Sequence, residues 1–175
     1  MGRDEAMNAL GAVGRQPDEM IDLAEAALLL AALDLPDADL SPYRRHLAEI
    51  AADVADAMSD AEDTLDARVA ALQQVIGDRH GYIGDSETYD DLDNANLVRV
   101  IDRRRGLPVA LGILYLHAAR AQGWRAFGIN FPGNFLVAVE DDEERVILDP
   151  FDRGAQVDIA SLRKLLKSAL GIEAE

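Results

Sequence analysis

The segment that most constrains the fold is a helix, residues 109–122, with apolar side chains on nearly all of its circumference. These are Val109, Leu111, Ile113, Leu114, Leu116, Ala118 and Ala119. A helix at a protein surface instead shows one apolar stripe. This helix is therefore predicted to be buried at the centre of the protein, with the other elements packed around it.

The turn Arg105-Gly106-Leu107-Pro108 precedes this central helix. Gly106 can adopt the left-handed conformation that ends a helix, and Pro108, with a fixed φ and no N–H, suits a first helical turn. The turn is therefore predicted to end one helix and to begin the next.

Composition limits the classes of partner and chemistry. With 175 residues the chain is expected to form one domain, and its net charge of −16 makes nucleic acid and anionic membranes poor partners. The chain has no cysteine, which excludes disulfides, thiolate nucleophiles and cysteine-based metal sites. Residues 1–14 resemble neither a signal peptide nor a membrane anchor, so we expect a cytoplasmic protein.

Helices are predicted from apolar spacing and capping residues. Residues 1–16 are expected to form a flexible N-terminus, and residues 17–171 a single domain, mainly helical over 17–106. Besides the central helix, the predicted helices cover residues 18–33, 41–59, 63–76, 93–106 and 159–170. In the last of these, Leu162, Leu165, Leu166 and Ala169 are expected to face the core.

Three strands are predicted after the central helix. Residues 124–131, 134–140 and 145–148 are short runs rich in Val, Ile and Phe. Helices first and strands later, without regular alternation, favour an α+β fold in which a small antiparallel sheet packs on the central helix.

A long segment without periodicity, residues 80–90, contains Tyr82 and Tyr89. The simpler interpretation is that the tyrosines anchor the loop; the alternative is a binding role. Arg103-Arg104-Arg105 has the same two interpretations, stabilising a helix C-terminus or binding an anion.

General searches for a catalytic or metal site find none. The sequence has no P-loop, dinucleotide fingerprint, His-Glu-x-x-His motif or Gly-x-Ser-x-Gly motif, and no metal or cofactor is expected. Ser86, Ser161 and Ser168 lie away in sequence from the turn at Pro108. The histidines, His46, His80 and His117, are most simply structural.

Several ordered motifs resemble the SirB-type branch, with bacterial members, of the transglutaminase-like superfamily. They are Tyr89-Asp90, residues 94–96, residues 103–108, Leu114-Tyr115-Leu116, residues 131–137 and Leu148-Asp149-Pro150-Phe151. The resemblance covers roughly residues 21–154 and implies a transglutaminase-like, papain-like core with an N-terminal helical layer.

The resemblance also assigns three positions of a catalytic triad. Pro108 stands where the wider superfamily has the nucleophilic Cys, Asn134 stands where it has His, and Asp149 keeps the family residue. Proline has no nucleophile, and an amide is not a general base near neutral pH. Asn134 and Asp149 are expected to form a structural hydrogen-bonded pair at most.

Two functional hypotheses follow. The first is a catalytically inactive transglutaminase-like domain that acts as a protein- or peptide-binding, scaffold or regulatory module, with an unidentified partner. The alternative is a hydrolase of unknown substrate that uses Asp149 by a mechanism without cysteine. The candidate binding residues are Tyr82, Tyr89, Asn96, Arg105 and Asn134. The sequence does not predict the oligomeric state.

Overall fold

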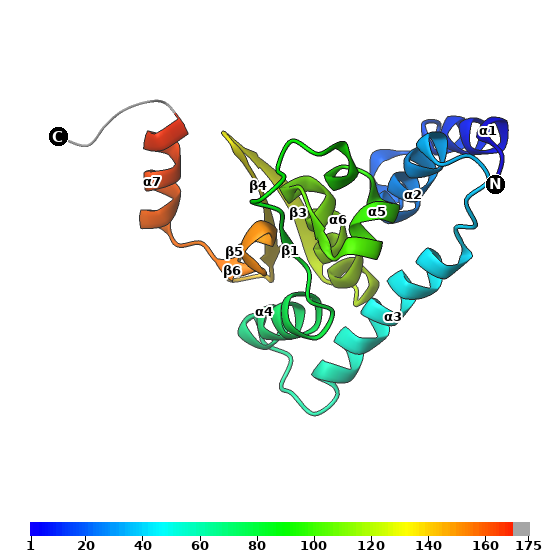
Figure 1. Ribbon diagram of the computed structural model, residues 1–175. Helices are drawn as coiled ribbons and strands as arrows, with labels where there is room; N and C mark the ends of the chain where they lie inside the picture. Colours follow the sequence, from blue (N-terminus) through cyan, green and yellow to red (C-terminus); the bar gives the residue numbers. More distant parts are fainter. Residues whose placement is uncertain (170–175) are drawn as a thin grey trace.

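The computed structural model describes residues 1–169 and combines helices with two small sheets (Figure 1). The α-helices are α1 (Arg3–Val13), α2 (Leu23–Asp34), α3 (Ser41–Met58), α4 (Leu65–Leu72), α5 (Leu97–Arg103), α6 (Pro108–Ala121) and α7 (Ile159–Ala169). The strands are β1 (Ile83–Gly84), β2 (Arg105–Gly106), β3 (Arg125–Phe131), β4 (Asn134–Glu140), β5 (Arg145–Asp149) and β6 (Ala155–Gln156). Short helical segments are η1 (Asp18–Met20), the π-helix η2 (Gln73–Arg79), η3 (Leu92–Asn94) and η4 (Pro150–Asp152).

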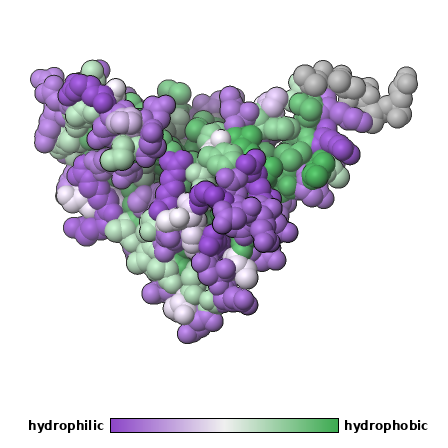
Figure 2. All heavy atoms as spheres, turned by 180° about the vertical axis from the view of Figure 1, so that it is seen from behind, coloured by the Kyte–Doolittle hydropathy of each residue, from purple (hydrophilic) through white to green (hydrophobic). Residues whose placement is uncertain are grey.

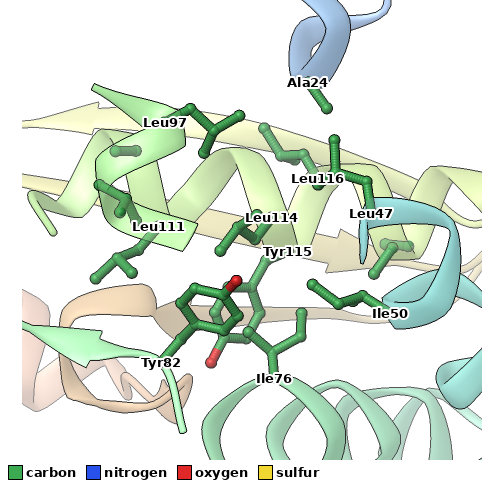
Figure 3. Packing of buried hydrophobic residues seen from close by; sticks show 14 of the residues in the cluster. Ala24, Leu47, Ile50, Ile76, Tyr82, Leu97, Leu111, Leu114, Tyr115 and Leu116 are labelled. Carbon is green, nitrogen blue, oxygen red and sulfur yellow. The ribbon is translucent and has the colours of Figure 1, made fainter. Parts of the chain in front are cut away.

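Helix α6 is the central buried helix that the sequence predicts. Pro108 is its first residue, and most of the helix is buried. Figure 3 shows its side chains Leu111, Leu114, Tyr115 and Leu116 meeting Leu47 and Ile50 of α3, Ile76 of η2 and Leu97 of α5. The apolar circumference of α6 therefore reflects neighbours on several sides.

The main sheet is antiparallel, with strand order β3-β4-β5-β6, and it packs on α6 through β3 and β4. Gly112 lets the sheet approach closely, because a Cβ there would lie 2.6 Å from the Phe135 ring on β4. The α+β prediction is confirmed, as are the three predicted strands to within one residue at either end. The two-residue strands β1, β2 and β6 are too short to produce a periodic pattern.

The helices before β1 differ from the prediction in three places. Residues 1–16, expected to be loosely packed, contain α1, whose Ala6 is fully buried. The helix expected over 18–33 is divided, because the Asp22 side chain accepts a hydrogen bond from Glu25 N–H and caps α2 there. The helix expected over 63–76 continues instead as the π-helix η2.

Helix α7 forms as predicted but does not face the core. None of its residues is buried, so the prediction that Leu162, Leu165, Leu166 and Ala169 point inward is wrong. Figure 1 shows α7 set apart from the rest of the molecule, on the side opposite α1 and α2. The spacing of apolar residues in α7 indicates a helix, but it does not identify what covers the apolar face. The predicted end of this helix at Leu170 lies outside the described residues.

Over residues 1–169 no helix has the length and apolar character that crossing a bilayer requires.

Because of the contact between α6 and β4, we expect a Gly→Ala substitution in α6 to lower the free energy of unfolding instead of raising it. In an exposed helix, Gly→Ala stabilises by about 1 kcal/mol. Gly112→Ala is expected instead to destabilise by about 1–3 kcal/mol, because the new methyl group overlaps the Phe135 ring. Urea unfolding measures the change. The matched control is Gly11→Ala in α1, where the nearest atom to a new Cβ is a side-chain nitrogen at 3.7 Å. Equal stabilisation by both substitutions would contradict this packing.

Candidate functional site

The positions Pro108, Asn134 and Asp149 lie at one end of the α6–sheet unit. Val137 pairs with Leu148, so the start of β4 and the end of β5 lie at the same end of two antiparallel strands. Gly112, one turn after Pro108, faces Phe135, the residue that follows Asn134. The first turn of α6 therefore lies over this end of the sheet, as the sequence motifs predict.

The side chains of Asn134 and Asp149 do not form the expected pair. The Asp149 carboxylate accepts a hydrogen bond from Phe151 N–H at 2.9 Å. Among the described residues no hydrogen bond joins Asp149 to Asn134. Burial raises the pKa of Asp149 above its usual value of 3.8, and nearby Asp152 adds to the effect.

Tyr115 of α6 lies beneath the loop that follows Asp149. Its side chain is fully buried, and its hydroxyl has no hydrogen-bond partner in the described part of the chain. A Cβ on Gly154 would lie 2.8 Å from this hydroxyl oxygen. Burial raises the pKa of Tyr115, so the phenol stays neutral. The motif Leu114-Tyr115-Leu116 was the available signal for this residue, but it did not predict the buried hydroxyl.

A comparison with known protein families identifies the family of this chain. A family model described as the transglutaminase-like superfamily matches residues 41–175. The chain belongs to the transglutaminase-like superfamily. No solved structure matches the chain significantly.

The relatives include bacterial UPF0162 proteins and a eukaryotic F-box protein. A UPF0162 protein from Xylella fastidiosa (strain Temecula1) is 32% identical over 159 residues, which cover 90% of this chain and 56% of that relative. A UPF0162 protein from Vibrio cholerae is 33% identical over 135 residues, covering 77% and 50%. F-box only protein 21 of Mus musculus is 28% identical over 104 residues, covering 55% and 17%. The chain thus spans about half the length of the bacterial relatives.

A groove lies beside Asp149 and is lined by residues that the sequence motifs do not include. Asp149 and Asp152 line one wall, and Ser161, Lys164 and Ser168 of α7 line the other, around a volume of about 350 Å³. Both serines are far in sequence from the turn at Pro108, so the sequence alone does not place them near Asp149. The chain reversal at β6 brings α7 next to Asp149, and no local motif encodes this proximity.

Two predicted binding residues, Tyr89 and Arg105, are exposed near the same region. The Tyr89 ring lies 6.0 Å from the ring of Phe151, which follows Asp149 closely in sequence. Arg105 forms an exposed ion pair of 3.1 Å with Glu87. Both side chains are therefore accessible to a ligand.

Two other predicted binding residues, Tyr82 and Asn96, serve the fold. Asn96 caps α5 by accepting a hydrogen bond from Arg99 N–H, and its amide donates to the Ala31 carbonyl at 3.4 Å. Tyr82 is fully buried, and burial raises its pKa to about 12. Neither side chain is therefore available to a ligand in the way that a binding residue requires.

A polar cluster surrounds the Tyr82 hydroxyl. His46 Nε2 lies 2.9 Å from Tyr82 Oη, and Arg104 Nη1 donates to both of these atoms. The edge of the His80 ring faces the His46 ring at 5.1 Å between centroids, and His80 Nε2 lies 2.6 Å from Asp53. Sequence reasoning missed this cluster because its members come from three segments that are far apart in the chain: α3, residues 80–82 and Arg104.

A second cluster fixes the loop after β1. Asp85 is 2% exposed and accepts hydrogen bonds from Thr88 N–H at 2.9 Å and from Glu87 N–H at 3.0 Å. Arg103 Nη2 donates to Asp85 at 3.0 Å. Backbone hydrogen bonding from Thr88 is the largest cause that lowers the Asp85 pKa from 3.8 to about 2. Arg103 therefore binds an internal carboxylate rather than only stabilising its own helix terminus.

Over residues 1–169 no group of three or more His, Asp or Glu side chains has an arrangement that could hold a metal ion.

The environment of His46 predicts a pH-dependent stability. Burial first, and then the charge of Arg104, lower the His46 pKa below 6.5, so the unfolded chain binds this proton more readily than the folded one. Stability from neutral His46 is expected to be complete above the unfolded pKa and to fall as the pH drops through 6.5. Urea unfolding of the wild type and His46→Gln at about pH 8 and about pH 5.5 measures this contribution. The difference between the two proteins should shrink at the lower pH; a constant difference would refute the assignment.

The Asp85 cluster predicts a loss of stability in more acidic solution, through protonation of a carboxylate instead of a histidine. Its carboxylate contributes stability above the unfolded pKa of 3.8, and this contribution is lost as the pH falls toward about 2. Asp85→Asn is therefore expected to lower the midpoint of thermal unfolding at neutral pH, with the gap from wild type closing in strong acid. Asp90→Asn, an exposed change in the same loop, is the control. An equal effect of both changes would contradict a specific role for Asp85.

Proposed function

We propose that this chain is a SirB-type transglutaminase-like domain that binds a protein or peptide at the degenerate active site and does not catalyse acyl transfer. The observation that carries the proposal is the buried Pro108 at the first position of α6. By resemblance this is the position of the superfamily's nucleophilic Cys. Proline offers no nucleophile, and the chain contains no cysteine.

The groove beside Asp149 supports a binding role. Half-buried Asp149 and exposed Asp152 present carboxylates on one wall, and exposed Tyr89 stands beside Phe151 at the same end of the sheet. Aromatic and charged side chains around a groove are typical of peptide recognition. Because the chain carries a net charge of −16, an extended segment rich in Lys or Arg is the favoured ligand.

The second candidate is a hydrolase that uses Asp149 without cysteine. The raised pKa of Asp149 favours it, because a carboxyl group titrating closer to neutrality is a better general acid or base. Ser161 and Ser168 in the same groove are hydroxyl groups that Asp149 would need to activate. No histidine is among the residues that line this groove, so neither serine has the general base that usually activates such a hydroxyl. We therefore favour the binding function over the hydrolase.

An activity and binding comparison separates the two functions. We expect wild type and Asp149→Ala to show the same background in transglutaminase, amidase and protease assays. In a peptide array that contrasts Lys/Arg-rich with Asp/Glu-rich sequences, Asp149→Ala should lower binding to basic peptides about tenfold, the effect of losing roughly 1.4 kcal/mol. Asp142→Ala, an exposed acid in the β4–β5 turn, is the matched control.

Two results would overturn the proposal. Turnover by wild type that Asp149→Ala abolishes would establish the hydrolase instead. Basic-peptide binding that Asp142→Ala and Asp149→Ala weaken equally would show attraction by overall charge without a site at Asp149.

A further inference from the structure

Helix α7 has an apolar face that the described chain covers only in part. Ile159 is 68% exposed and Leu166 is 40% exposed, whereas Leu162 and Leu165 are half-buried. Figure 2 shows apolar side chains gathered on this arm of the molecule, next to the grey atoms. Such a face on a helix set apart from the domain is typical of a docking element.

The charge of α7 is opposite to that of the whole chain. Residues 159–169 contain Arg163, Lys164 and Lys167 and no acidic residue, whereas the chain as a whole has a net charge of −16. None of these three cations forms an ion pair within the described residues. The helix therefore combines an apolar face with unpaired positive charge, and its complement is an apolar groove with negative charge.

Such a groove, the β3 groove, lies at the far edge of the sheet and has a volume of about 880 Å³. Its apolar residues are Met20, Ile21, Leu23, Leu116, Trp124 and Phe127. Met20 is 70% exposed. The size of the groove suits one face of a short helix, and its lining matches the apolar face of α7.

The charged residues of the β3 groove leave negative charge available. Asp18 and Glu19 line it and form no ion pair within residues 1–169. Asp22 and Glu140 also line the groove, so its acids outnumber its two cations, Arg120 and Arg125. Arg125 is paired with Asp142 at 3.0 Å. Charge and apolar surface thus complement α7 together.

The α7 of one chain does not reach the β3 groove of the same chain. Helix α7 follows β6 at one edge of the sheet, and the groove adjoins β3 at the other edge, roughly 14 Å across the strands. Val157 N–H donates to the Ile147 carbonyl and holds the linker to the sheet. Only Asp158 remains between that bond and the helix, and its side chain caps α7 by accepting from Ser161 N–H.

We propose that α7 docks into the β3 groove of a second copy of this chain, and that the exchange is reciprocal, giving a two-fold dimer. Each copy supplies one helix and one groove, so a closed pair covers both helices and leaves no free groove. The apolar faces supply the driving force, and Arg163 and Lys167, which flank the exposed apolar face of α7, meet the Asp18 and Glu19 side of the groove. Lys164 points to the other side of the helix, into the groove beside Asp149. The large net charge opposes association at long range, so the local complementarity decides it.

Sedimentation of the full chain tests the dimer. Between about 1 µM and about 1 mM, which spans dissociation constants for −8 to −4 kcal/mol, the mass should rise from 19.0 kDa toward twice that value. Leu166→Glu, on the exposed apolar face, should keep the protein monomeric over this range. Ser168→Glu adds the same charge at an exposed position on the opposite face of α7, one turn from Lys164, and should leave association unchanged.

A mixing experiment tests the reciprocal contact. Met20→Glu in the groove should also abolish self-association, yet its helix remains intact, as does the groove of Leu166→Glu. An equimolar mixture of these two variants should therefore form heterodimers through one contact, at least tenfold weaker than the wild-type dimer. Both substitutions are at exposed positions, and circular dichroism checks that each variant is folded.

Three outcomes overturn the proposal. The first is a wild type that sediments as a monomer up to about 1 mM. The second is equal weakening of association by Leu166→Glu and Ser168→Glu, and the third is unchanged association of Met20→Glu. The last two would place the contact away from the apolar face of α7 or from the β3 groove.

Discussion

The structure depends on burying one short helix on several sides. Helix α6 packs against α3, α5 and the π-helix on some faces and against β3 and β4 on another. Gly112 sets how closely the sheet approaches, because the Phe135 ring occupies the space where a side chain would be. The end of the sheet that carries Asn134 and Asp149 is positioned by this one contact, so the packing of the core places the candidate site.

Sequence reasoning succeeded where the signal was local. The apolar run of α6, the Ser41-Pro42 start of α3 and the alternating strands each carry their pattern within a few residues. It failed where the deciding partner is distant in sequence. The polar cluster joins His46 to Arg104 across 58 residues, and Arg104 must adopt a left-handed backbone conformation at the end of α5 to take part. No local pattern indicates such a contact.

The candidate site was predictable in position but not in its chemistry. Pro108, Asn134 and Asp149 lie at one end of the sheet, as their motifs predict, because each motif sits at the boundary of a regular element. The burial that raises the Asp149 pKa and the unpartnered hydroxyl of Tyr115 depend on side chains that converge only in the folded chain. Tyr82 shows the converse, since a tyrosine in a loop resembles a binding residue until its burial is known.

The two buried polar clusters have a consequence for how the chain reaches this topology. Apolar contacts around α6 tolerate small shifts, whereas His46, Tyr82 and Arg104 satisfy one another only in one register of α3 against α5. These contacts close long loops, so they form after the local helices. A collapsed chain with α6 buried but misaligned would leave buried Asp85 and Tyr82 and half-buried Arg104 without their partners. The clusters therefore discriminate against compact misfolded states, a selectivity that the apolar core does not supply by itself.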